Sequence, residues 1–303
     1  MSLYSKIQNI KTQIIETERL LELVISHPLM SINLKEKLNS LNKELEALPK
    51  ETYEPKVELL FSGDAVSGSE GIKLNFLNKI LNPFQELLKI QVAISAFTNK
   101  IKREALKSKS TLYLTALPTG SFGIELSQLD KKDLLDDIEV SQSMKNIINL
   151  IAQVTEDDEK FEQALETYPK SIFKNLKKIF KAVSEENSML KIESNEIHLE
   201  IPEDRIQLAY NRVSKSTDNS KDILVEGIFK GILLESGKFE IVTNEGNYIS
   251  GFISEDLDID TLISYKDFIN TSQQFLLSKN EIEFNTGNNK TTYELKEIIL
   301  KIT

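Results

Sequence analysis

The sequence predicts an α+β protein with three parts: an N-terminal helical hairpin of the coiled-coil kind, a central mixed or antiparallel sheet packed by helices, and a small C-terminal β-barrel. Three observations support this prediction. Apolar residues recur at three- and four-residue spacing near the N-terminus, β-branched runs joined by turn residues follow, and glycine-containing strand patterns fill the C-terminal part. The expected units are residues 1–50, 56–216 and 222–303.

Two apolar stripes predict the helical hairpin. His27-Pro28 separates them, because a proline inside a helix removes a hydrogen bond and clashes with the preceding turn. Each arm has about 20 residues and is roughly 30 Å long at the helical rise, so the hairpin is long enough to project and to serve in assembly. The residues expected to mediate oligomerisation are Ile7, Ile10, Ile14, Leu21, Leu34, Leu38, Leu41 and Leu45.

An alternative for these stripes is packing on the body of the same subunit, as amphipathic helices commonly do. Each arm has only about two or three heptads, which is shorter than a sustained coiled-coil repeat. The residues outside the stripes are mixed in sign and fit a solvated face.

The central unit begins with a strand at 57–61, followed by the glycine-punctuated loop Gly63–Gly71 and a long helical pattern that Pro83 is expected to bend or split. Two β-hairpins are expected, at 111–126 and 189–201. Further helices are expected at 131–153, 156–167, 169–185 and from Pro202 to about Lys215. The polar run 216–221 is typical of a linker between domains.

The C-terminal unit has five strand patterns and one short helix near 255–264. Glycines in the long strand at 223–234 are expected to mark a bend, as small barrels require at their corners. Asn244–Asn247 is a strong hairpin turn between strands 238–243 and 247–253. The last two strands are expected near 273–285 and 291–299. This pattern predicts a small SH3-like or OB-like barrel.

Composition limits the chemistry. The chain has no cysteine and two histidines, which argues against disulfides, thiolate zinc sites and histidine-based catalysis. No run reaches the ~18 apolar residues of a membrane span, and no signal peptide is evident, so a cytoplasmic protein without a membrane partner is expected. The net charge of −10 disfavours binding to nucleic acid, because the phosphate backbone attracts proteins with a surplus of lysine and arginine. No cofactor is expected.

The glycine loop is the one place where the order strand, loop, helix suggests phosphate binding, because free backbone N–H groups at a helix start attract anions. The candidate ligand-binding residues are Gly68, Ser69 and Gly71. A Walker loop would end in Gly-Lys-Ser/Thr, whereas Glu70 stands here. A structural turn, with Ser69 as a helix cap, is the favoured interpretation.

No catalytic or metal-ligating set emerges from the remaining motifs. Gly120–Gly123 lacks the spacing of a nucleophile elbow. Glu255–Asp260 is rich in carboxylates but lacks the glycine of a calcium loop, so an acidic helix start is expected. His27 at the hairpin turn and His198 on a strand are expected to be surface residues.

Three blocks, Gly63–Ile72, Pro83-Phe84-Gln85 and Leu114–Gly123, resemble those of a family of uncharacterised bacterial proteins. The similarity covers about 57–300. The resemblance implies the ordered Gly-Ser-x-Gly-Ile, Phe-Gln and Gly-Ser-Phe-Gly blocks and the trailing barrel, and it transfers no activity to any residue. A component of a bacterial antiviral defence system is an alternative that this resemblance implies.

Taken together, these patterns favour a cytoplasmic, non-enzymatic assembly or adaptor protein whose N-terminal hairpin binds a protein partner or a second copy. One alternative is a nucleotide or small-anion sensor that uses the Gly63–Gly71 loop. A second alternative is a hydrolase or nuclease that acts through carboxylates and a divalent metal ion.

Overall fold

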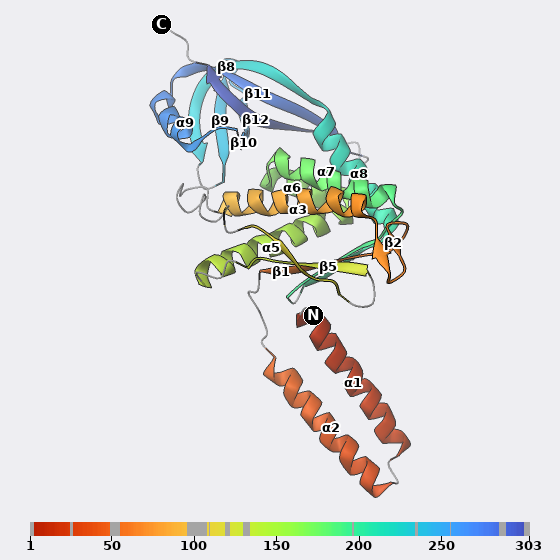
Figure 1. Cartoon of the computed structure of the whole chain (residues 1–303). Coiled ribbons are helices and arrows are strands. Elements are labelled where there is room, and N and C mark those ends of the chain that lie inside the picture. The colour runs from red at the N-terminus through yellow and green to blue at the C-terminus, as the bar shows by residue number, and fades with distance from the viewer. Residues whose placement is uncertain are drawn as a thin grey trace.

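The computed structural model of the 303-residue chain describes every residue except 1–2, 25–26, 49–54, 96–107, 109, 119–121, 130–133, 196, 234–235, 255, 285–288 and 300–303. Figure 1 shows a helical hairpin at one end, a sheet with its helices in the middle and a β-barrel at the other end. The predicted α+β class and the C-terminal barrel are confirmed.

The hairpin consists of α1 (Leu3–Leu23) and α2 (Pro28–Ala47), which pack on each other as antiparallel arms and project from the body (Figure 1). Local sequence explains the break between them. His27 is the N-cap of α2, because its Nδ1 accepts a hydrogen bond from the Met30 amide at 3.4 Å. Pro28 occupies the first helical turn, where its missing N–H is not needed.

A five-stranded antiparallel sheet forms one layer of the central part. Its strands, in spatial order, are β4 (Tyr113–Ala116), β5 (Phe122–Ser127), β1 (Lys56–Phe61), β6 (Leu190–Ser194) and β7 (Ile197–Ile201). Every neighbouring pair is antiparallel, so the mixed arrangement is not the one adopted. The edge strand β4 has an irregular register between Leu114 and Ala116.

Helices stack on one side of this sheet, with α5 against the strands and the others beyond it (Figure 1). They are α3 (Leu74–Ser95), α5 (Leu134–Glu156), α6 (Asp158–Thr167), α7 (Lys170–Glu185) and α8 (Glu203–Asp218). Their apolar faces and the inward residues Val57, Leu59 and Phe61 form one core. The expectation that Pro83 could split its helix is wrong, because α3 continues through it.

The barrel contains five strands around a second core. They are β8 (Ser220–Leu233), β9 (Lys238–Thr243), β10 (Tyr248–Ile253), β11 (Ser272–Glu283) and β12 (Asn289–Ile299). α9 (Ile259–Ser264) and the short 3-10 helix η1 (Tyr265–Phe268) connect β10 to β11. Gly231 has a φ of 133° where the β8–β9 register shifts, so a glycine does mark the predicted bend. Asp258 caps α9, as the acidic helix start predicts.

The predicted linker at 216–221 is wrong. α8 continues to Asp218 and β8 begins at Ser220, so the helix leads almost directly into the barrel. The far end of β11 also returns to the central part, where Ile282 and the following Phe284 belong to the central core and are 2% and 6% exposed. The barrel therefore packs firmly against the central helices.

Candidate functional site

The eight predicted oligomerisation residues lie along the contact between α1 and α2. Ile10 and Leu41 are buried, at 4% and 7% exposure, and the other six are half-buried. The first partner of each stripe is therefore the other arm of the same hairpin. Within the described residues, neither apolar core includes a hairpin residue, although α1 also comes close to β6 of the body.

Large apolar side chains remain exposed on the hairpin outside this contact. They are Ile15 at 65%, Leu20 at 49%, Leu23 at 75%, Met30 at 51% and Ile32 at 52%. Several such residues on a thin projection are unusual for a surface that faces only water. The sequence did not predict this surface, because the apolar periodicity of each arm indicates its stripe alone.

The candidate ligand residues Gly68, Ser69 and Gly71 lie in a short hairpin of β2 (Val66–Ser67) and β3 (Gly71–Ile72). The Glu70 amide donates to the Ser67 carbonyl at 3.0 Å and closes the turn. Helix α3 begins only at Leu74, so Ser69 as a helix cap is wrong. None of the three residues lines the cavities of about 400, 370 and 20 Å³ that lie between the described helices and strands.

The start of the same loop is fixed by the turn that follows α7. The Asp64 amide donates to the Glu186 carbonyl at 2.9 Å, and Asn187 Nδ2 donates to the Asp64 carboxylate at 2.9 Å. Lys73 pairs with Glu186 at 2.6 Å and Lys79 with Glu185 at 2.9 Å. The hydrogen bond from Lys79 lowers the pKa of Glu185. These contacts support the interpretation of the loop as a structural turn.

Two cavities have the size of small-ligand sites. One of about 400 Å³ lies between α8, α6 and the end of β11, and it includes Tyr210 and Lys215. Arg212 in its wall is already bound, because its Nε donates to Asp158 at 2.5 Å and its Nη1 to the Val154 carbonyl at 3.2 Å. The second, of about 370 Å³, lies between α3 and α7. Both arise where helices meet, which the linear sequence does not reveal.

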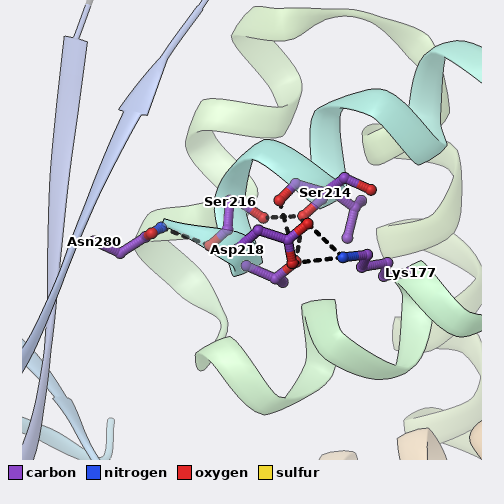
Figure 2. A network of polar contacts seen from close by, with 7 residues as sticks. Lys177, Ser214, Ser216, Asp218 and Asn280 are labelled. Carbon is purple, nitrogen blue, oxygen red and sulfur yellow. Dashed lines mark hydrogen bonds and ion pairs between the residues drawn. The ribbon is translucent and has the colours of Figure 1, made fainter. Parts of the chain in front are cut away.

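The barrel meets the central helices through a polar network at the end of α8. Figure 2 shows Lys177 of α7 and Asp218 pointing toward each other, with Nζ at 2.5 Å from the carboxylate. On the other side Asn280 of β11, which is 2% exposed, donates from Nδ2 to the Ser216 carbonyl at 2.5 Å. This network links three elements that are distant in the sequence.

A third, much smaller cavity of about 20 Å³ lies at the same junction and includes Lys170, Asn280 and Glu294 in its wall. Burial, followed by repulsion from Lys174, lowers the pKa of Lys170. A cavity of this volume holds about one water molecule. The junction is therefore closely packed rather than open to a substrate.

The two histidines lie in different parts of the fold, His27 at the turn of the helical hairpin and His198 on β7. His27 is the helix cap described above. His198 is half-buried rather than fully on the surface, with Nδ1 at 3.2 Å from Glu193 across the β6–β7 pair. Among the residues that the structure describes, no group of three histidine or acidic side chains is arranged to hold a metal ion.

No helix in the described part of the chain has the length and apolar character needed to span a bilayer. The resemblance inferred from the three sequence blocks stays a prediction. Comparison with protein-family models, curated proteins and solved structures found no match to this chain.

Proposed function

We propose that this chain is a cytoplasmic, non-enzymatic assembly or adaptor protein that acts through protein–protein contacts of the α1–α2 hairpin. One observation carries the proposal. The described hairpin residues belong to neither core, the two arms bury apolar residues against each other, and five large apolar side chains of the hairpin are still exposed. A docking element needs such a surface, because burial of apolar area supplies most of the free energy of association.

The two alternatives have less support. A nucleotide or small-anion sensor at Gly63–Gly71 would use the N-terminus of α3, but that helix begins beyond the loop. A metal-dependent hydrolase or nuclease would need carboxylates that converge, and the described residues offer no such group.

We further propose that the barrel is of the OB type rather than the SH3 type. Its strands close in the order β8, β9, β10, β12, β11, with β10 and β12 parallel and a helix between β10 and β11. This matches a five-stranded Greek-key barrel. Residues 222–303 include 14 acidic and 7 basic residues, which disfavours the oligonucleotide binding seen in many such barrels.

Lysine cross-linking in cells, followed by mass spectrometry, tests the docking role. We expect links from the exposed hairpin lysines, such as Lys11 and Lys37, to a second polypeptide chain. Replacing Ile15, Leu20, Leu23, Met30 and Ile32 together by serine should abolish these links.

A matched control replaces Leu74, Leu114 and Leu224, which are similarly exposed but lie on the body. This control should retain the hairpin links. Inter-chain links that survive the five-residue hairpin variant, or that start only from the barrel, would contradict the docking role.

A further inference from the structure

Each arm of the hairpin carries a second stripe directly beside the buried contact. On α1, the residues that follow Ile10, Ile14, Thr17 and Leu21 form the α1 flank, which consists of Lys11, Ile15, Glu18 and Glu22. On α2, the residues that follow Ser31, Leu34, Leu38, Leu41 and Leu45 form the α2 flank, which consists of Ile32, Lys35, Asn39, Asn42 and Glu46. All nine are exposed.

The two flanks share one face of the hairpin. Their three- and four-residue spacing keeps each flank on one side of its helix. Two antiparallel arms are related by an approximate two-fold axis perpendicular to the plane of the hairpin. Rotation about this axis exchanges the arms but does not exchange the two faces of the hairpin. Residues that directly follow the contact positions therefore lie on the same face in both arms.

Both flanks are electrically polarised along the chain. The α1 flank runs from Lys11 through Ile15 to Glu18 and Glu22, and the α2 flank runs from Lys35 to Glu46. Among the described hairpin residues, an ion pair joins Lys6 to Glu44 at 3.8 Å, and the flank charges take part in none. The apolar residue of the α1 flank, between its lysine and its two glutamates, is Ile15, which is 65% exposed.

This pattern is self-complementary in one direction only. Two parallel α1 flanks would place lysine beside lysine and glutamate beside glutamate. Two antiparallel α1 flanks place Ile15 on Ile15 and each Lys11 opposite the glutamates of the other copy. An isologous contact of this kind is typical of two-fold homodimers.

We propose that a second copy of this chain covers this face, with the two α1 flanks antiparallel about a two-fold axis at Ile15. Lys11 then faces Glu18 and Glu22 of the partner subunit. The inference rests on the proposed docking function and names its partner. The product is a four-helix bundle with antiparallel neighbours, in which the half-buried residues between the arms gain further cover.

Engineered cysteines test the geometry, because the chain has none of its own. Ile15→Cys should form a covalent dimer under mild oxidation of the full-length protein. Leu23→Cys is the matched control: it is even more exposed, at 75%, but lies outside the α1 flank. Ile15→Cys cross-linking no faster than Leu23→Cys would overturn the proposal.

Charge reversal provides a second measurement, by sedimentation equilibrium of the full-length protein. Lys11→Glu should weaken the dimer about tenfold, and the triple variant Lys11→Glu, Glu18→Lys, Glu22→Lys should restore it because the pattern is inverted as a whole. Circular dichroism should show an unchanged helix content in each variant. A monomeric wild type, or no rescue by the triple variant, would refute self-pairing.

The cross-linking experiment in cells separates this inference from the docking function. Links from the hairpin to a different polypeptide, together with a monomeric purified protein, would refute self-pairing and leave the docking function supported. If the hairpin formed links neither to a second copy nor to a different polypeptide, both self-pairing and the docking function would be refuted.

Discussion

At the scale of single residues, Gly63 fixes the chain where it leaves β1. Its φ is 86°, and a Cβ atom built on it would lie 2.2 Å from the Asn187 carbonyl oxygen. The backbone of the loop and the turn after α7 are therefore in direct contact, which only glycine permits. Gly71, by contrast, has open space around its Cα and no positive φ.

We expect Gly63→Ala to lower the free energy of unfolding by about 3 kcal/mol, since a left-handed φ costs roughly 1–2 kcal/mol and overpacking typically adds 1–3 kcal/mol. Gly71→Ala should change it by less than about 0.5 kcal/mol. Urea denaturation of the two variants measures both values. Equal effects would mean that the loop is not held against Asn187.

Lys170 gives a prediction with a defined dependence on pH. Its pKa is lowered in the folded state, so the folded protein binds that proton less tightly than the unfolded chain does. Lys170→Met should therefore stabilise the protein at pH 7. The advantage should shrink as pH rises through the lowered pKa toward the ordinary lysine value of 10.5.

Thermal denaturation at pH 7 and pH 9.5 checks this prediction. Lys266→Met, at an exposed lysine on η1, is the matched control and should show little change at either pH. A melting temperature of Lys170→Met below that of the wild type at pH 7 would show that the ammonium group stabilises the junction instead.

At the scale of elements, the hairpin has an apolar contact of its own. Ile10 and Leu41 are buried between its own arms, and neither core of the body draws on described hairpin residues. Removing residues 1–54 should leave a body that unfolds cooperatively with a nearly unchanged melting temperature, as calorimetry would show. Loss of cooperative unfolding would indicate that the hairpin is part of the body.

The sequence predicted most elements because their patterns are local. The alternation of Val57, Leu59 and Phe61 and the Asn244–Asn247 turn both depend on neighbouring residues only. The prediction of a linker at 216–221 was wrong for a physical reason. Ser216 and Thr217 look like linker residues, but their hydroxyl groups donate to the Val213 carbonyl at 2.8 and 3.0 Å and extend α8.

The last turn of α8 is covered by a residue that lies far along the chain. Asn280 lies 64 positions after Ser216 and donates a hydrogen bond to its carbonyl. No local sequence pattern predicts such a contact. For the candidate site, the two stripes were visible in the sequence. The exposed flanks became visible only after the structure had shown which apolar residues the two arms share.

At the scale of the whole molecule, the barrel and the central part are joined by shared core residues. Phe284 packs edge-on against Phe161 of α6, with ring centroids 6.2 Å apart. Lys290 of β12 donates to Glu166 at 2.6 Å, and this hydrogen bond lowers the pKa of Glu166. Residues 222–303 on their own would expose Ile282 and Phe284, so the sequence-based expectation of an independent barrel is not favoured.

Calorimetry of Phe284→Ala tests this coupling. The substitution should cost about 3 kcal/mol, at the low end for a buried phenylalanine because the site is near the surface. A single transition at a lower temperature should include both the barrel and the central helices. Two separate transitions, with only one of them shifted, would show that the parts unfold independently.

The irregular register of β4 bears on how this protein avoids aggregation. Strands at the open edge of a sheet recruit strands of other molecules, whereas the closed barrel offers no such edge. All four residues of β4 are exposed, but its ladder breaks between Leu114 and Ala116, where the Thr115 hydroxyl donates to Glu125 at 2.8 Å. A mutation that straightened this strand would create a template for edge-to-edge pairing, so the break lowers the tendency of the protein to aggregate at high concentration.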